Sequence, residues 1–466
     1  MRRWLLTLLG GVVVAAPVLA TRFGPPPGLV AGATALVVAG ALVRRAAGLH
    51  LRRLTLPAVW FLSYVTMVAL PAFVVVADKD TKYVGPYLLG VFSALLAVPV
   101  GMLIVNAATG FNPREVERFF AASIAPEPPV AEETAAYVLI LTGALVLTAG
   151  YLIETPVIPL LYLIRNPGSA AVLIGLREES FKLLDSPLLY FYSVLRNVVY
   201  PFLIMVSLGY YLTSRQVRWL AIFSITAAVG LFYAAITIAK LPVAVIVLTL
   251  VLFVYLYVGG RVSLRAALIG MAAVFVFPVA VLTVSLSGFD VSLWFILKAM
   301  FNRLFYLPAE ILYNYFVIVP DVLPYQLGGT VGRFRWVLGE PEFDMSNYVF
   351  TYMFPERIES GTAPAAFLGY LHADFGLVGI LLGGAVVGII LQTIQVGLTR
   401  RPKTVVTLAA YAYLMWLAWK LNMESFPQTL LSGGIVVIYL LMGLLRLTQG
   451  FLRTATVPPA DRPARP

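Results

Sequence analysis

The stretch Tyr83–Ala108 reads YVGPYLLGVFSALLAVPVGMLIVNAA and contains no charged side chain. A helix of this length crosses the hydrocarbon core of a bilayer, which needs about 20 residues. Backbone N–H and C=O groups cannot stay unpaired in lipid, so such a run forms either a helix or part of a closed barrel. Because the run is continuously apolar instead of alternating, the barrel is excluded. The stretch therefore predicts a membrane-spanning α-helix.

Similar runs recur along the whole chain of 466 residues. The chain is 61% hydrophobic and 12% charged, about half the charge of a typical soluble protein. It has no cysteine, so the fold needs no disulfide or thiolate metal site. We predict an all-α polytopic membrane protein with about 12 transmembrane helices. The predicted spans are Trp4–Ala20, Gly28–Val43, Leu56–Ala77, Tyr83–Ala108, Ala135–Ile153, Leu188–Thr213, Val217–Ala239, Leu241–Val258, Leu264–Ser287, Gly376–Leu398, Thr404–Trp419 and Gln428–Leu447.

Basic residues gather in alternate segments between these spans. One set of segments holds 19 Lys and Arg against six Asp and Glu, and the rest of the chain holds 14 against 16. Cytoplasmic loops carry the basic excess, so both termini are placed in the cytoplasm and Asp290–Gly361 outside. This topology explains the net charge of +11 without a nucleic-acid partner. Trp4–Ala20 also fits a cleavable signal peptide, although an uncleaved helix is favoured because a second span follows closely.

The organisation predicted from these segments is one integral membrane domain over residues 1–466. It includes a cytoplasmic linker at 110–134, an external loop at 154–187, a large external loop at 288–375 and a disordered cytoplasmic tail at 454–466. Ser169–Leu184 is predicted to be an amphipathic helix in the membrane interface. Asp290–Val319 is apolar but interrupted by charges, so we predict an interfacial or re-entrant helix pair, broken at Pro308.

Ionisable residues inside spans are candidate functional positions, because burying them in lipid is costly. Arg196 lies about eight residues into its span, roughly 12 Å from the external end. Lys240, Lys420 and Glu424 also lie in the outer half, as a pocket open to the exterior requires. Two alternatives stay open. Lys240 and Lys420 can extend their ammonium groups to the interface, and Lys420 and Glu424 can pair at i,i+4.

Three arginines of the large external loop are candidates for phosphate recognition, because the guanidinium fork binds phosphate oxygens in a bidentate manner. Arg303 lies on a predicted helix face, where anchoring to lipid headgroups is the alternative. Arg333 and Arg335 follow the Gly-rich run at 328–332, which lacks the Gly-Lys-Ser/Thr of a nucleotide-binding loop. This segment is either a flap that carries the two arginines to an anion or a plain surface loop.

His372 and Asp374 are candidates for the base that takes a proton from a sugar hydroxyl. They precede the predicted tenth span. The alternatives are that Asp374 caps the following helix and that His372 is an interfacial residue. No His/Cys cluster or paired carboxylates favour a metal site, so we predict neither a metal nor a cofactor.

Three motifs between about residues 190 and 400 resemble those of the Wzy-type O-antigen polymerases, a family related to the O-antigen ligases. The first is Ala239-Lys240-Leu241, where the family usually has Ser-Arg-Gly. The second runs from Arg303 through aromatic residues to Pro320 and Gly328. The third is Gly361-Thr362, followed by Phe-Gly-Leu-Val-Gly at 375–379. Lysine at 240 keeps the charge of the family's arginine but not its fork.

The resemblance implies a metal-independent glycosyltransferase of the GT-C type in the bacterial inner membrane. It would transfer a growing glycan from undecaprenyl diphosphate to another lipid-linked oligosaccharide repeat unit on the periplasmic side. Arg196, Lys240 and Arg303, with Arg333 and Arg335, would bind the diphosphate, and His372 or Asp374 would activate the acceptor. The partners implied are the donor and acceptor lipids, membrane lipid and a chain-length regulator protein.

Two other functions compete with this one. A ligase would transfer the finished glycan to lipid A core, but ligases place a histidine where this chain has Pro364. A flippase or transporter of lipid-linked oligosaccharide would need a polar cavity reached from both sides, whereas the predicted buried charges lie on one side only. The sequence favours the polymerase.

Overall fold

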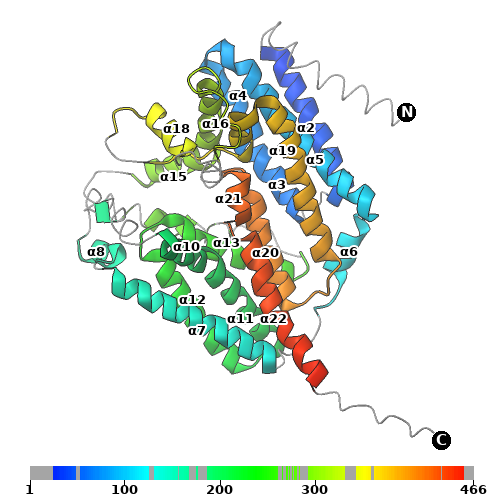
Figure 1. The fold of residues 1–466 in the computed structure, drawn as a ribbon, viewed down its shortest axis with the longest axis vertical. Helices are drawn as coiled ribbons and strands as arrows, with labels where there is room; N and C mark the ends of the chain where they lie inside the picture. Colours follow the sequence, from blue (N-terminus) through cyan, green and yellow to red (C-terminus); the bar gives the residue numbers. More distant parts are fainter. Residues whose placement is uncertain are drawn as a thin grey trace, which may run out of the picture. The chain divides into compact units, whose positions relative to one another are not determined.

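The structure is a computed structural model of the whole chain. The residues that it describes are 25–48, 53–124, 131–155, 157–166, 175–176, 186–260, 292–330, 343–357, 361–431 and 433–455, with scattered positions between 265 and 283. Among these residues the regular elements are helices, labelled in Figure 1.

Seven helical stretches are long and apolar enough to cross a membrane, and two shorter apolar helices accompany them. The described chain is therefore an all-α, multi-pass membrane protein. The seven are Leu56–Val75, Thr81–Thr109, Glu133–Glu154, Tyr190–Ser214, Val217–Ala235, Phe367–Thr399 and Phe426–Leu445, and the two shorter ones are Leu241–Tyr257 and Val405–Lys420.

These nine helices coincide with nine of the predicted spans. Gly28–Val43 also lies within a helix, α2 (Pro25–Ala47). Trp4–Ala20 lies outside the described residues, and Leu264–Ser287 is described only at scattered positions. The described residues thus show seven candidate spans and two shorter apolar helices, and the count of about 12 stays a prediction. The amphipathic helix predicted at Ser169–Leu184 lies almost wholly outside the described residues.

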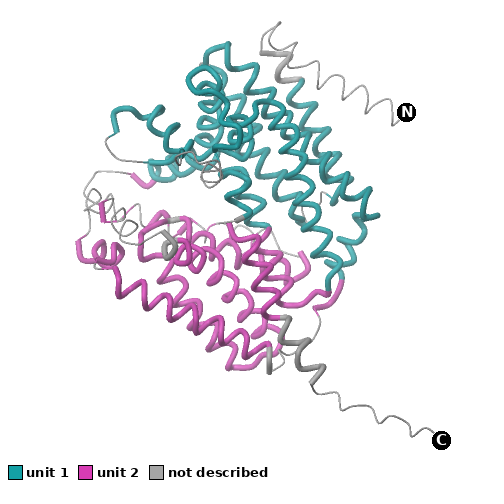
Figure 2. Tube along the Cα trace, in the orientation of Figure 1, with its two compact units in different colours: residues 1–121, 294–401, 415–430 teal, residues 122–293, 402–414, 431–466 magenta. Residues whose placement is uncertain are grey.

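The chain divides into two compact units, coloured in Figure 2. Unit 1 comprises residues 1–121, 294–401 and 415–430. Its main elements are α2, α3 (Leu56–Tyr64), η1 (Val65–Ala69), α4 (Leu70–Val75), α5 (Thr81–Thr109), α6 (Arg114–Ala121), α15 (Leu293–Phe301), η4 (Asn302–Tyr306), α16 (Leu307–Ile318), α18 (Met345–Met353), α19 (Phe367–Thr399) and α21 (Phe426–Leu431).

Helices α5 and α19 pack closely within unit 1, because small residues line their contact. A Cβ atom added at Gly388 would lie 1.9 Å from the Val98 carbonyl oxygen, and one added at Gly101 would lie 2.0 Å from that of Ala385. A side-chain amide bond joins the same pair of helices, since Gln392 Nε2 donates to Asn106 Oδ1 at 2.7 Å.

A surface ion pair lies at the C-terminal end of α19. Arg400 donates to both carboxylate oxygens of Glu115 on α6, at 2.9 and 3.2 Å. This guanidinium contact lowers the pKa of the Glu115 carboxyl below its ordinary value. A depressed pKa in the folded state stabilises the fold above the unfolded-state pKa, and this stabilisation is lost as the pH falls through the folded value.

We expect Glu115→Gln to lower the unfolding temperature slightly near neutral pH. The difference from the wild type should disappear in acid, where the wild-type carboxyl is also protonated. Thermal unfolding in detergent across the pH range measures this. Glu117→Gln on the same helix is the control, because Glu117 lies 3.6 Å from Arg53 and is 51% exposed. A Glu115 effect that did not change with pH would contradict the prediction.

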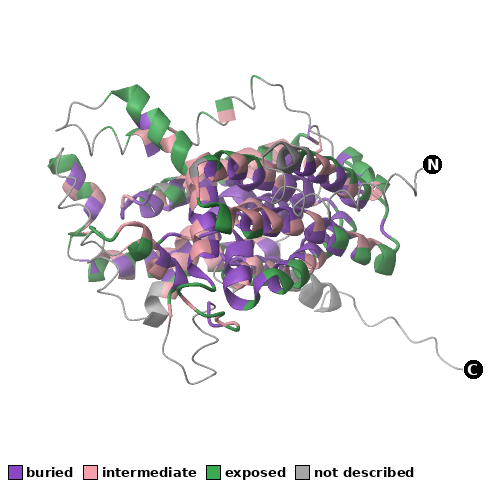
Figure 3. Cartoon of the chain, turned by 90° about the horizontal axis from the view of Figure 1, so that it is seen from above, coloured by how far each residue is buried: buried purple, intermediate pink, exposed green. Residues whose placement is uncertain are grey.

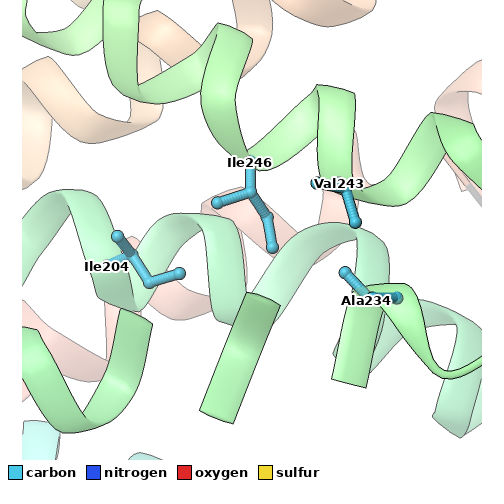
Figure 4. Close-up of a cluster of buried hydrophobic side chains, with 5 residues drawn as sticks. Ile204, Ala234, Val243 and Ile246 are labelled. Carbon is cyan, nitrogen blue, oxygen red and sulfur yellow. The ribbon is translucent and has the colours of Figure 1, made fainter. Parts of the chain in front are cut away.

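Unit 2 comprises residues 122–293, 402–414 and 431–466. A cluster of Ile204, Ala234, Ala235, Val243 and Ile246 forms part of its core (Figure 4). Figure 3 shows buried and exposed residues on the described helices. The main elements are α7 (Ala131–Glu154), α8 (Pro159–Arg165), α10 (Ser186–Val194), η3 (Leu195–Val199), α11 (Tyr200–Ser214), α12 (Val217–Ala235), α13 (Lys240–Tyr257), most of α20 (Val405–Lys420) and α22 (Ile435–Ala455).

Three π-helical turns interrupt the described helices, and a proline follows each one at the same spacing. Pro71, Pro201 and Pro308 lie two residues beyond the ends of η1, η3 and η4. Proline lacks an N–H, and its ring clashes with the carbonyl four residues earlier. A π-turn widens the helix at that point. Helix α5 contains Pro86 and Pro99 with no such turn, so proline alone does not produce it.

The predicted break at Pro308 is wrong. Helical structure continues from Leu293 to Ile318, through η4 into α16, and Pro308 lies in the first turn of α16. The widened turn accommodates the ring, so the chain does not have to leave the helix. The first half, α15, is largely exposed, whereas α16 is mostly buried.

Candidate functional site

Arg196 lies in the π-turn η3, inside a candidate membrane span of unit 2. Its side chain is half-buried, and Nη1 donates a hydrogen bond to Thr237 Oγ1 at 2.9 Å. Thr237 is 1% exposed and belongs to the short connection between α12 and α13. Lys240 begins α13, three residues later. The structure therefore brings the Arg196 guanidinium to the segment that leads into Lys240.

In the π-turn, the Asn197 carbonyl oxygen accepts a hydrogen bond from Tyr413, a residue that the sequence did not mark as part of the site. Asn197 lies four residues before Pro201, which has no N–H to donate to it. The hydroxyl of Tyr413 lies 2.9 Å from the Asn197 carbonyl oxygen, and also 2.9 Å from that of Gly433. Tyr413 thus helps to fix the turn that carries Arg196. No local pattern marks it, because 216 residues separate the two partners.

Arg303 occupies the equivalent position in the η4 turn of unit 1. Both arginines are the second residue of a π-turn and lie five residues before its proline, Pro201 or Pro308. Arg303 is exposed. Segment η4 packs against η1, the other π-turn of unit 1. An Arg-x-x-x-x-Pro spacing inside an apolar helical run is the sequence signal that links the two arginines.

His372 lies in the short first part of α19, four residues before Gly376, where the helix breaks and where the span was predicted to start. Its Nε2 lies 3.0 Å from the Val319 carbonyl oxygen, so Nε2 carries the proton of this bond. The ring stacks on Phe316 with centroids 3.8 Å apart. The imidazole is 7% exposed. In this arrangement His372 fixes the end of α16 to α19.

Asp374 is buried two residues further along α19. It contacts the segment that follows α16, at Leu327 and Thr330. Its two carboxylate oxygens accept hydrogen bonds from the Thr330 backbone N–H at 3.1 Å and from the Thr330 hydroxyl at 2.6 Å. Its carbonyl accepts from the Leu327 N–H at 3.1 Å. Gly376 then leaves the helical conformation, with φ 63° and ψ −148°. The predicted start of the span at Gly376 thus coincides with the break between the two helical parts of α19.

Residues 319–330 are consequently held at several places in unit 1. Besides the contacts with His372 and Asp374, the Gln326 N–H donates to the Ala373 carbonyl oxygen at 2.9 Å. Asp321 also accepts hydrogen bonds from Lys82 and from the Tyr83 hydroxyl. The Lys82 contact lowers the pKa of the Asp321 carboxyl. The base role predicted for His372 or Asp374 remains a prediction, and the contacts described here give both residues a structural role.

The other predicted site residues are described less completely. Arg333 and Arg335 lie outside the described residues. The backbone of Lys240 is described, but its side chain is not. Arg196 and Lys240 belong to unit 2, whereas Arg303, His372 and Asp374 belong to unit 1. Within the described residues there is no group of three or more His, Cys, Asp or Glu side chains that could hold a metal ion.

One further ionic pair lies in unit 1. Lys420 Nζ is 2.6 Å from Glu424 Oε2, and their side chains are 22% and 15% exposed. The i,i+4 pairing considered from the sequence is therefore formed.

Comparison with known proteins gives no identity for the chain, since no family model, no curated protein and no solved structure matches it. The membrane class rests on the helices themselves.

Proposed function

We propose that this chain is a glycosyltransferase that polymerises oligosaccharide repeat units carried on undecaprenyl diphosphate. It would transfer the growing glycan to a new lipid-linked unit at the outer face of the inner membrane. In this reaction the acceptor hydroxyl loses its proton and attacks the anomeric carbon of the donor sugar. The bond from that carbon to the diphosphate oxygen breaks, and the lipid diphosphate leaves.

The observation that carries the proposal is the position of Arg196. A charged side chain within a membrane span is costly and marks a functional position by default. Arg196 is half-buried there, in a π-turn, a feature frequent at functional sites. Its guanidinium is a planar fork of N–H donors, of which Nη1 donates to Thr237. Such a group suits the phosphate oxygens of a lipid diphosphate, whose growing negative charge it would stabilise.

A second arginine supports the same proposal from unit 1. Arg303 has the same place relative to its π-turn and proline as Arg196. It is exposed on a segment whose neighbour α15 presents Trp294 and Phe295 to the surroundings, 74% and 59% exposed. Exposed aromatic residues beside a cation fit the headgroup region of a bilayer, where the diphosphate of a lipid-linked glycan lies. The resemblance to the polymerase family agrees with this assignment.

The test uses the purified full chain in lipid nanodiscs with lipid-linked repeat units. We expect a ladder of glycan lengths without added nucleotide sugar and with divalent metals removed by chelation. A single product carrying the glycan on added lipid A core would instead identify a ligase. Movement of unaltered substrate across liposomes, with no glycan extension, would identify a transporter and overturn the proposal. Addition of a chain-length regulator would then show whether such a partner changes the ladder.

A further inference from the structure

Transfer to a sugar hydroxyl needs a group that accepts the hydroxyl proton. The two groups predicted for this role have other contacts in unit 1. The Nε2 proton of His372 is donated to Val319, and the ring is stacked on Phe316. Both carboxylate oxygens of Asp374 accept hydrogen bonds from Thr330. Nδ1 of His372 has no hydrogen-bond partner among the described residues, but it is buried in a residue that is 7% exposed. A base must also be reached by its substrate, which favours a more exposed carboxylate in the same unit.

Glu424 has such a carboxylate. It lies in the turn between α20 and α21, where it forms an ion pair with Lys420 and interacts electrostatically with Tyr370. The side chain is 15% exposed although its Oε2 atom is buried, so the carboxylate is largely withdrawn from bulk solvent. An i,i+4 pair joins two residues of one segment and ties no distant elements together. Because withdrawing two charges from water is costly, the fold gains little from this pair, which favours a functional role.

The turn that carries Glu424 is held by two long-range hydrogen bonds. The Leu421 carbonyl oxygen accepts a hydrogen bond from the Phe367 N–H at 3.0 Å, at the start of α19. Asn422 is fully buried, and its Nδ2 donates to Ser63 Oγ at 2.7 Å. Two long-range bonds therefore hold the residues immediately before Glu424. A rigid support of this kind is what a proton-accepting group needs for a constant position.

The same contacts lead from Glu424 toward Arg303. Ser63 lies near the end of α3, which continues directly into the π-turn η1. Segment η1 packs against η4, the turn that carries Arg303. All of these elements belong to unit 1. The turn that carries Glu424 and the π-turn that carries Arg303 thus belong to one continuous set of packed elements.

We propose that Glu424 is the general base of the transfer, an inference that rests on the proposed function. Its carboxylate takes the proton from the acceptor hydroxyl while that oxygen bonds to the anomeric carbon of the donor sugar. The bond from this carbon to the diphosphate breaks, and the leaving oxygen keeps the electron pair. The proton on Glu424 then passes to solvent. Lys420 is a positioning residue, which orients the carboxylate through its ammonium group.

The experiment compares Glu424→Gln with the wild type in the ladder assay, measuring kcat and KM for the lipid-linked unit separately. We expect kcat to fall by about 10²–10⁴-fold, the usual contribution of a general base, with KM near the wild-type value. Glu424→Asp should recover part of the loss, because it restores a carboxylate. Elution as a single species and an unchanged unfolding temperature show that the variants fold.

Glu310→Gln is the matched control. Among the described residues of unit 1, Glu310 is also a half-buried glutamate paired with lysine, at 3.3 Å from Lys79, with side chains 26% and 32% exposed. That pair ties α16 to the segment before α5, so the variant should unfold at a lower temperature but keep its kcat. Equal kcat values for Glu424→Gln and Glu310→Gln would overturn the inference, as would a change confined to KM. A wild type without any ladder would instead overturn the proposed function.

Discussion

Replacing Arg196 by alanine is expected to lower the rate of glycan extension by about 10²–10³-fold, the usual effect of removing one donor from a charge-stabilising site. The guanidinium lies half-buried in a membrane span, where its interactions with a phosphate are screened little by water. Arg196→Lys keeps the charge and loses the planar fork, so it should retain an intermediate rate. The measurement is the ladder assay with the purified protein in nanodiscs.

The control for this variant is Arg218→Ala in the same unit. Arg218 is exposed on α12, and its Nε donates to Gln216 at 2.6 Å. Removing it should leave both the rate and the unfolding temperature close to the wild type. If Arg196→Ala extended glycans as fast as Arg218→Ala does, the assignment of Arg196 to the diphosphate would be wrong.

Arg303→Ala should reduce extension to a similar degree through its own contact with phosphate, and it distinguishes two roles of that residue. An arginine that only anchors η4 to anionic headgroups would become dispensable in nanodiscs of lipid without net charge. An arginine that binds the substrate diphosphate would remain necessary in every lipid. Comparing the wild type with Arg303→Ala in anionic and neutral nanodiscs therefore separates the roles, and we expect the loss in both.

The largest expected loss of stability follows Gly388→Ala. The added Cβ would lie 1.9 Å from the Val98 carbonyl oxygen on α5, and the backbone of Met102 is 3.1 Å away. Because both obstacles belong to the backbone of a neighbouring helix, α5 and α19 must separate. Overpacking of this kind costs about 1–3 kcal/mol, and occasionally more. Unfolding in a denaturing detergent series measures the change in the free energy of unfolding.

Gly397→Ala is the control on the same helix. An added Cβ at Gly397 meets no atom within 4 Å, so no packing is disturbed. Alanine favours the helix over glycine by about 1 kcal/mol, and this variant should be as stable as the wild type or more so. Equal stability of the two alanine variants would show that α5 and α19 do not approach at Gly388 as described.

The candidate site was predictable in residue type more than in arrangement. Arg196 stands out in the sequence because a charge interrupts an apolar run. Arg196 and Arg303 are alike in their position within a π-turn that precedes a proline. The sequence does not reveal that turn, because Pro99 lies in a helix without a π-turn. The partners of His372 and Asp374, Val319 and Thr330, lie 53 and 44 residues away in the sequence. Local patterns carry no information on contacts at such separations.

The sequence by itself determined the membrane class and the places of most spans. Lipid offers no partner for backbone N–H and C=O groups, so a long apolar run has to become a helix wherever it occurs. Only the tertiary structure decided how these helices meet. The approach of α5 to α19, the bond of Asn422 to Ser63 and the turn that carries Glu424 depend on which helix faces lie together. That choice follows from packing and hydrogen bonding between distant residues, which hydropathy along one segment does not contain.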